Sequence, residues 1–320
     1  MVTRSTIAGS STAAMNDGLE DGTLFDIERP AISLADRFVE PPFSLLDRRK
    51  GDWQDRKRRW LASGVERDAI GREDGLTYGE HADNEFGAIF SQRGGTTSVF
   101  DPVVAELAYR WFSCEGDAVL DPFCGGAVRG LVAGALGRRY SGVDVRQAQL
   151  DANEEARQGR YVGQVEWLLG DATKLLDTFP LDVFDLAFTC PPYAYLERYS
   201  DQADDISTYS YSDFAKALRE SLWGAYQLLD NDRFCVYVLG DARQQQGDGR
   251  YEGLIADCIT AARDVGFGLY NYLVTADPVG SAPARASRLF DTTRKVVKSH
   301  QDVLVFVKGD GKAAGKRVIG

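Results

Sequence analysis

The sequence has few of the side chains that build metal sites. Its 320 residues include two histidines, His81 and His300, and five cysteines, none of which forms a Cys-x-x-Cys pair. Zinc sites use closely spaced cysteine and histidine ligands, so this composition argues against one. Scattered cysteines also fit reduced thiols better than a disulfide framework. We therefore expect a cytoplasmic protein without a bound metal.

Long apolar runs are missing as well. No segment approaches the roughly 18 apolar residues that a membrane-spanning helix requires. The first residues include Arg4 but no apolar stretch of the kind found in secretory signals. A hydrophobic share of 44% is typical of a globular protein. The length favours one large domain with an extension over two equal domains, and no membrane partner is expected.

Negative charge exceeds positive charge overall, but the positive charge is locally concentrated. The net charge is -11, which argues mildly against a nucleic-acid partner, because nucleic acids attract basic surfaces. Two basic clusters qualify that argument. They are residues 48–59 and the set Arg285, Arg288, Arg294, Lys295 and Lys298. At a contact surface the local charge matters more than the sum.

Composition and periodicity divide the chain into four parts. Residues 1–40 are rich in Ser, Thr, Ala, Gly and Asp, and we expect them to be a disordered arm. The remaining parts are an N-terminal extension, a main domain and a flexible tail, at residues 41–95, 96–310 and 311–320. Within the main domain, Asp101 followed by Pro102 predicts the start of a helix.

The main domain alternates strand and helix patterns. Strands are predicted at 118–123, 139–145, 165–169, 183–189, 233–239, 267–275 and 302–308. Helices are predicted at 127–137, 147–158, 172–178, 212–229 and 252–265. This alternation implies an α/β fold with a mostly parallel, seven-stranded sheet covered by helices on both faces. No clear helix separates the last two strands, since residues 277–299 are polar and basic, so the last strand is expected to be antiparallel.

Four strand ends carry the unusual residues of this chain. They are Asp121-Pro122-Phe123-Cys124-Gly125-Gly126-Ala127, Asp144, Asp171 and Thr189-Cys190-Pro191-Pro192-Tyr193. Ligands bind at the carboxyl ends of the strands in an open parallel sheet. Small residues after the first strand let a ligand approach the backbone, and a carboxylate at Asp144 can accept the hydroxyls of a ribose. The two prolines lack N–H donors and end their strand.

Each of these features also has a purely structural interpretation. Asp144 could cap the helix that begins at Gln147, and Asp171 could be a turn residue. Pro191 and Pro192 could do no more than terminate a strand. Only the combination of all four strand ends in this order favours a binding site.

Two of the segments resemble motifs of a known family. Asp121-Pro122-Phe123-x-Gly125 is similar to the first cofactor motif, and Cys190-Pro191-Pro192-Tyr193 to the catalytic motif, of S-adenosylmethionine-dependent DNA amino-methyltransferases. These enzymes methylate N6 of adenine or N4 of cytosine. The likeness covers about residues 95–310, including the closing segment His300–Lys308. Residues 40–60 and the layout also resemble phage-encoded DNA-modification methylases.

The resemblance implies a Rossmann-like methyltransferase domain at 96–310 that binds S-adenosylmethionine and double-stranded DNA. It implies a location in the cytoplasm of a bacterium or of a phage-infected cell. The implied cofactor-binding residues are Asp121, Pro122, Phe123, Gly125, Asp144 and Asp171. The implied catalytic residues are Cys190, Pro191, Pro192 and Tyr193.

The catalytic motif has a physical rationale. The lone pair of an exocyclic base amine is delocalised into the ring, so a loop that accepts hydrogen bonds from the NH2 group favours its reactive form. By the resemblance, Cys190 and the carbonyl of Pro191 accept these bonds. Tyr193 would stack on the target base after it is flipped out of the duplex. Tyr195, Arg285, Arg288, Lys295 and Lys298 are candidate nucleic-acid contacts.

The chain departs from the family pattern at two positions. Ala127 replaces the last glycine of the cofactor motif, and Cys190 replaces Asp, Asn or Ser. Cysteine is closest in shape to serine, which is more typical of N4-cytosine enzymes, so cytosine is slightly favoured. Three alternatives stay open: attack of Cys190 on a pyrimidine ring, an RNA or protein-amide substrate, and an inactive binding module in which Cys190 is the lesion.

Overall fold

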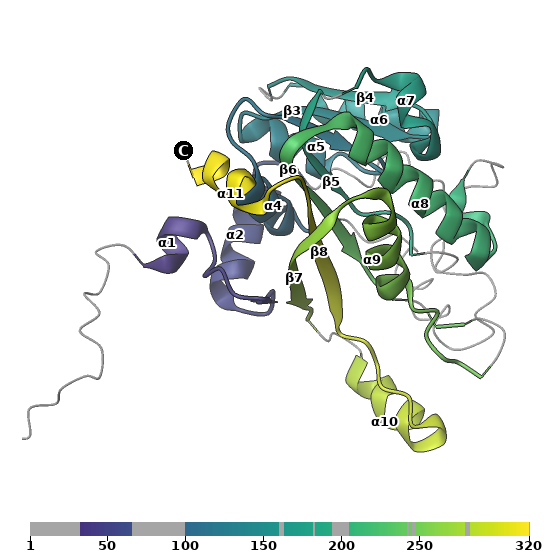
Figure 1. Ribbon diagram of the computed structural model, residues 1–320. Coiled ribbons are helices and arrows are strands. Elements are labelled where there is room, and N and C mark those ends of the chain that lie inside the picture. Colours follow the sequence, from purple (N-terminus) through teal and green to yellow (C-terminus); the bar gives the residue numbers. More distant parts are fainter. Residues whose placement is uncertain are drawn as a thin grey trace, which may run out of the picture.

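One sheet forms the centre of the computed structural model (Figure 1). The structure describes residues 33–65, 100–159, 163–181, 183–193, 205–241, 243–244, 248–278 and 282–319. The strands in these residues are β1 (Leu45–Asp47), β2 (Ala118–Asp121), β3 (Arg139–Asp144), β4 (Val165–Leu169), β5 (Phe184–Thr189), β6 (Leu229–Leu239), β7 (Gly268–Ala276) and β8 (His300–Lys308). Their order across the sheet is β1-β7-β8-β6-β5-β2-β3-β4.

The predicted α/β architecture is confirmed, with a mostly parallel sheet, an antiparallel last strand and helices on both faces. β8 is antiparallel to its neighbours β6 and β7, and the other neighbouring strands are parallel. Strands β2 to β8 correspond to the seven predicted ones. β1 is an additional strand from the N-terminal extension, in which Leu45 lies opposite Val274 of β7. Three residues are too few to show a periodic pattern, so the sequence does not predict β1.

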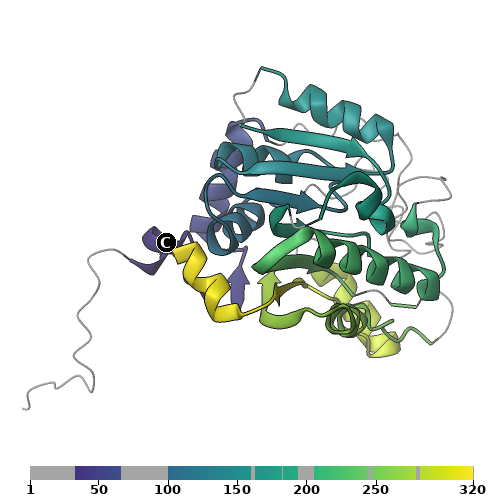
Figure 2. The same ribbon diagram turned by 45° about the horizontal axis from the view of Figure 1, so that its top comes forward.

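Helices cover both faces of the sheet (Figures 1 and 2). They are α1 (Leu34–Phe38), α2 (Gly51–Ala62), α4 (Pro102–Phe112), α5 (Val128–Ala135), α6 (Gln147–Arg157), α7 (Leu175–Thr178), α8 (Tyr211–Leu228), α9 (Leu254–Val265), α10 (Ala282–Thr293) and α11 (Gly311–Ile319). Helices α4, α5, α6 and α11 pack on one face, and α7, α8 and α9 on the other. Along β6, Phe234 and Val236 point into the first core, while Cys235 and Tyr237 point into the second. No helix in the described residues is long and apolar enough to cross a membrane.

Three of the seven basic residues in the first cluster, Arg48, Arg56 and Lys57, form ion pairs with the main domain. Arg56 contacts both carboxylate oxygens of Glu106, which also accepts the indole N–H of Trp60 at 2.7 Å. Lys57 lies 3.4 Å from Asp101, whose other oxygen caps α4 as predicted. These pairs dock α2 on α4, so Arg56 and Lys57 have a structural role.

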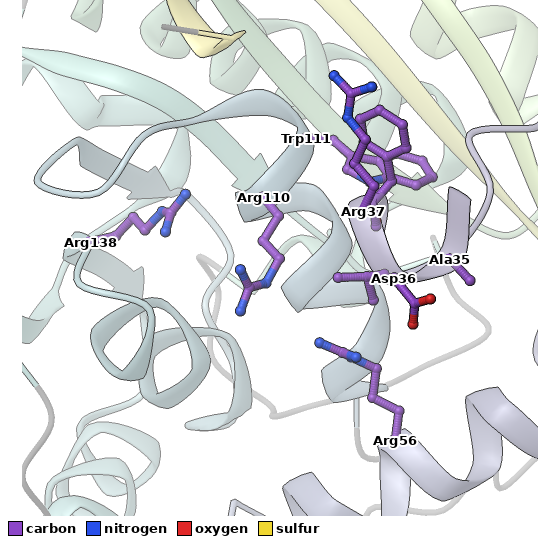
Figure 3. Close-up of a pocket in the computed structure, with 9 residues that line it drawn as sticks. Ala35, Asp36, Arg37, Arg56, Arg110, Trp111 and Arg138 are labelled. Atoms are coloured by element: carbon purple, nitrogen blue, oxygen red, sulfur yellow. The ribbon is translucent and has the colours of Figure 1, made fainter. Parts of the chain in front are cut away.

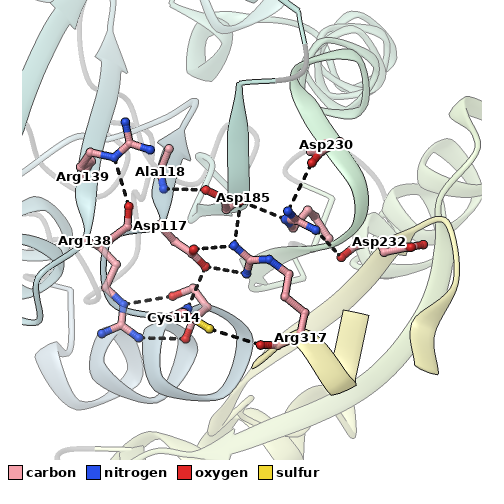
Figure 4. A network of polar contacts seen from close by, with 12 residues as sticks. Cys114, Asp117, Ala118, Arg138, Arg139, Asp185, Asp230, Asp232 and Arg317 are labelled. Atoms are coloured by element: carbon pink, nitrogen blue, oxygen red, sulfur yellow. Dashed lines mark hydrogen bonds and ion pairs between the residues drawn. The ribbon is translucent and has the colours of Figure 1, made fainter. Parts of the chain in front are cut away.

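The C-terminal residues differ from the expected flexible tail, because they form α11. Ala314 is buried against the sheet. Arg317 forms ion pairs with Asp117 at 2.5 Å and with Asp185 at 2.9 Å, and Figure 4 shows how this network ties α11 to the starts of β2 and β5. A glycine- and lysine-rich segment has a weak helical pattern, and these tertiary contacts decide its structure.

Two further segments differ from expectation. Residues 33–40 of the expected arm contain α1, and the carbonyl of Phe38 accepts the indole N–H of Trp111 at 2.8 Å. Within 277–299, where no clear helix was expected, the structure contains α10. Residues 1–32, and the expected domain boundary at 95–96, lie outside the described residues.

Candidate active site

The predicted strand ends meet at one edge of the sheet. β5, β2, β3 and β4 are parallel neighbours, so their carboxyl ends lie side by side. Asp121, Asp144 and Thr189 are the last residues of β2, β3 and β5. Asp171 follows two residues after β4. The structure therefore brings together the segments that the sequence singles out.

The carboxylate of Asp121 joins the two motif loops and is completely buried. Arg129 Nε and the Tyr140 hydroxyl donate to Oδ2 at 2.6 and 2.7 Å. The Thr189 hydroxyl donates to Oδ1 at 2.6 Å and accepts the N–H of Phe123 at 3.1 Å. Thr189 thus connects the Cys-Pro-Pro-Tyr loop to residues 122–127, which contain Gly125 and Gly126 and are called the glycine turn below. Because the protein engages both oxygens of Asp121, this residue holds the loops together.

Arg129, on α5, stabilises the glycine turn by hydrogen bonds to its backbone. Its Nη2 donates to the carbonyls of Phe123 and Cys124 at 2.7 and 2.9 Å. The guanidinium also lies 4.7 Å from the ring centre of Phe100. Burial alone would lower its pKa, but the charge of Asp121 outweighs burial and holds the pKa well above its usual value. The sequence gives no signal for this role, since an arginine in a first helical turn is usually solvated.

The glycine turn leaves space for a ligand. Gly125 has φ +48°, and among the described residues no atom lies within 4 Å of the Cβ that another residue would place there. Its carbonyl accepts a hydrogen bond from Asn153 Nδ2 at 2.7 Å, and Gln149 donates to Asn153 at 3.0 Å. Both side chains are buried on α6. They therefore hold the turn open, although the sequence does not single them out.

Asp144 lies beside this turn, at the end of β3. Its Oδ1 accepts the N–H of Arg146 at 2.9 Å, and the Arg146 guanidinium is 3.3 Å away. Arg146, not Asp144, is the N-cap of α6, so the capping alternative for Asp144 is wrong. Burial raises the pKa of the Asp144 carboxyl above its ordinary value, and the charge of Arg146 only partly opposes this.

Asp171 is engaged in a turn, as its structural interpretation predicts. Its Oδ1 accepts the N–H and the hydroxyl of Thr173, both at 2.8 Å, and Lys174 pairs with Oδ2 at 3.0 Å. After the cost of burial, these contacts leave the pKa of Asp171 below its ordinary value. A role in cofactor binding stays a prediction.

The Cys-Pro-Pro-Tyr loop is anchored by residues from outside the motif. Pro191 and Pro192 are buried, and Cys190 and Tyr193 are half-buried. The Tyr193 hydroxyl lies 3.4 Å from Cys190 Sγ and accepts a hydrogen bond from Gln301 Nε2 at 2.7 Å. The Tyr193 ring packs on the backbone of Gly240, where a Cβ would approach Cε2 to 2.9 Å. Gln301 is a site residue that no local motif reveals.

The predicted nucleic-acid contacts are only partly placed. Arg288 is exposed on α10, and Lys295 is half-buried just after this helix. Lys298 forms an ion pair with Asp302 at 2.7 Å, which reduces its availability to a phosphate. Tyr195, and the side chain of Arg285, lie outside the described residues.

A cavity of about 440 Å³ lies elsewhere, at the amino ends of the strands (Figure 3). Arg138 precedes β3, and Arg110 lies in the last turn of α4, which leads into β2. Arg56 and Arg110 bind Glu106, and Arg138 donates to the carbonyl groups that end α4. The guanidinium groups around this cavity are thus engaged in the fold.

Comparison with known proteins gives a limited likeness. No family profile matches the chain. A segment of 77 residues is 32% identical to a tRNA (guanine(10)-N2)-dimethyltransferase from Pyrococcus abyssi and spans 23% of each chain. TrmN from Thermus thermophilus is 18% identical, with a TM-score of 0.45 over 65% of this chain and 49% of that one. Magnesium protoporphyrin IX methyltransferase from Synechocystis, solved with bound SAM, is 14% identical, with a TM-score of 0.42 over 80% and 96%.

The described residues fit S-adenosylmethionine as the cofactor. The open glycine turn and the Asp144 carboxylate lie at neighbouring strand ends, where this cofactor needs backbone access and a hydroxyl acceptor. Within the described residues, no three His, Cys, Asp or Glu side chains form a group that could hold a metal.

We expect Asp121→Asn to destabilise the protein strongly. The substitution leaves Arg129 buried without its carboxylate, which costs about 3–5 kcal/mol of unfolding free energy. Urea denaturation measures this loss. As a control, Asp264→Asn removes an exposed carboxylate 4.0 Å from Arg219 and should leave the midpoint nearly unchanged. Equal stability of the two variants would show that the Asp121–Arg129 pair does not hold the loops.

We expect Asp144→Asn to weaken S-adenosylmethionine binding by about 10- to 100-fold, the value of a hydrogen bond to a charged group. Because the pKa of Asp144 is raised, the wild-type carboxylate protonates at a higher pH than an ordinary Asp. Wild-type affinity should therefore fall as the pH is lowered from neutral into the acidic range, beginning at a higher pH than for an ordinary Asp, and the variant should lose this dependence.

Isothermal titration of the purified chain over this pH range measures both effects. Asp151→Asn, an exposed change on α6, is the matched control. The same affinity for Asp144→Asn and for the wild type at neutral pH would remove Asp144 from the cofactor site.

Proposed function

We propose that this protein transfers a methyl group from S-adenosylmethionine to an exocyclic amino group of a DNA base, with N4 of cytosine slightly favoured over N6 of adenine. The observation that carries the proposal is the Thr189 hydroxyl between Asp121 and Phe123 N–H. It fixes the loop that resembles the amine-binding motif directly beside the loop that resembles the cofactor motif.

The chain's own residues would orient the reaction. Pro191 and Pro192 make a stiff loop whose carbonyl groups can accept the amine hydrogens. Tyr193, held against Gly240, offers a ring for a flipped base, and base–aromatic stacking contributes about 1–3 kcal/mol. Holding the amine in line with the methyl group supplies much of the rate acceleration.

Helix α10 supports a nucleic-acid partner. Figure 1 shows it projecting from the sheet beyond β7, and β7 ends at the same edge as β2 and β5. Residues 282–299 carry three arginines and two lysines but one aspartate. This local excess of positive charge, on a chain of net charge -11, suits a polyanion.

RNA is the second candidate substrate. The relative from Pyrococcus abyssi is named for a tRNA and for N2 of guanine, which is also an exocyclic amine. Both candidate reactions therefore methylate an exocyclic amine of a base. They differ in whether the substrate is DNA or RNA.

The function is tested by incubating the purified chain with methyl-labelled S-adenosylmethionine and either plasmid DNA or bulk tRNA. Nucleoside mass spectrometry should show labelled N4-methylcytosine or N6-methyladenine in the DNA. Label found only in tRNA would move the proposal to RNA, and cofactor binding without transfer to either would refute a nucleic-acid methyltransferase.

Tyr193→Ala should lower the transfer rate by about 10-fold or more, because it removes the stacking surface. Cofactor affinity should stay within about twofold of the wild type, since Tyr193 is not at the glycine turn. Tyr251→Ala, a change of an exposed ring beside Arg243, is the control. An unchanged rate in Tyr193→Ala would exclude its role as the base platform.

Arg288→Ala should weaken nucleic-acid binding similarly for all base sequences. Loss of one phosphate contact lowers the slope of log affinity against log salt by about 0.9. Fluorescence anisotropy with a labelled duplex at several salt concentrations measures the slope. Arg263→Ala, which removes an exposed charge from α9, should leave it unchanged. An unaltered slope in Arg288→Ala would place α10 outside the interface.

A further inference from the structure

A chain of hydrogen bonds runs from the N-terminal extension to Cys190. Arg48 Nη1 donates to Gln301 Oε1 at 3.1 Å. Gln301 Nε2 donates to the Tyr193 hydroxyl at 2.7 Å. That hydroxyl lies 3.4 Å from Cys190 Sγ. These residues belong to the segment after β1, to β8 and to the motif loop, so three distant parts of the sequence meet here.

The direction of the first two bonds follows from the donors. A guanidinium can only donate, so Gln301 presents its oxygen to Arg48 and its amide N–H to Tyr193. Arg48 is itself held by Asp101 at 2.9 Å and Asp277 at 2.6 Å, and its side chain is 14% exposed. The amide of Gln301 is therefore fixed in one orientation.

We propose that Arg48 and Gln301 are positioning residues that make the Tyr193 hydroxyl a hydrogen-bond donor to Cys190 Sγ. The sulfur is thereby held as an acceptor for the hydrogen of the target amine, where the resembling family has an oxygen. This inference rests on the proposed function for its role in transfer, but the direction of the bond to sulfur is independent of it.

The surroundings of Cys190 agree with an acceptor sulfur. The charge of Arg129 on α5 faces Cys190, and Tyr193 faces it from its own loop. A cation and a hydroxyl donor both favour a thiolate over a thiol. Asp121, paired with Arg129, opposes part of this effect.

Gln301→Glu tests the direction of the relay. Glutamate has the same shape and still accepts from Arg48, but it cannot donate to Tyr193. The Tyr193 hydroxyl would then donate to the new carboxylate, and Cys190 would lose the hydrogen bond from Tyr193. We expect kcat to fall about tenfold or more, with the melting temperature maintained and KM for the nucleic acid within about twofold. Gln158→Glu, the same change at an exposed site, is the control.

A double-mutant cycle separates a relay from simple packing. If Gln301 acts through the Tyr193 hydroxyl, the pair Tyr193→Phe and Gln301→Leu should have the kcat of Tyr193→Phe alone. Additive losses, or an unchanged kcat in Gln301→Glu, would overturn the inference.

A measurement without substrate keeps the two proposals distinguishable. The pH dependence of iodoacetamide alkylation, followed at the Cys190 peptide by mass spectrometry, gives the pKa of this thiol. Tyr193→Phe and Gln301→Leu should each raise that pKa, because each removes donation to the sulfur. An unchanged pKa overturns the relay even if methylation is found. A raised pKa with no methylation of DNA or RNA supports the relay and refutes the proposed function.

Discussion

The rest of the site depends on the buried contact between Asp121 and Arg129. Asp121 ends β2, and its two oxygens reach Tyr140 on β3, Thr189 on β5 and Arg129 on α5. Each partner carries a different segment, so a single carboxylate sets the spacing of the glycine turn and the Cys-Pro-Pro-Tyr loop. In a dry environment this arrangement is stable only while every partner is present, because a buried ion that loses its partner is costly. Asp121 thus contributes to the site by holding protein segments in place, and the space beside Gly125 remains open to a ligand.

The sequence predicted the sheet well because its signals are local. Apolar strands, helix caps such as Asp101, and the prolines after Thr189 all act within a few residues, and the structure places them where the pattern indicates. The elements that the pattern missed depend on partners far away in the chain. β1 is stabilised by pairing with β7, where it lies beside Val274. α11 is stabilised by the ion pairs of Arg317 with Asp117 and Asp185. Such segments have little intrinsic preference, so tertiary contacts decide their structure.

The same distinction applies to the site. The motif residues are recognisable because each stands at a strand end with an unusual neighbour. Arg129, Asn153 and Gln301 are ordinary residues whose importance comes from a carbonyl or a hydroxyl that lies far away in the sequence. Gln301 in particular sits in an apolar strand, where an isolated amide could have been an edge residue facing solvent. Only the fold shows that its amide oxygen binds Arg48 and its amide nitrogen binds the Tyr193 hydroxyl.

The distribution of charge connects the extension with the proposed substrate. Arginines and lysines between residues 48 and 58 pair with Asp47, Asp55, Asp101, Glu106 and Asp277. Arg48, Arg56 and Lys57 thereby fasten the segment after β1 and helix α2 to the domain, while Arg49 and Arg58 pair with neighbours in their own segment. The second cluster lies on and after α10, where Arg288 is exposed and Lys298 pairs with Asp302, on a chain that is acidic in total. The net negative charge would repel a polyanion, and the positive residues on and after α10, which follows the carboxyl end of β7, would attract it. An acidic net charge is therefore compatible with a nucleic-acid substrate, and it favours one orientation of approach.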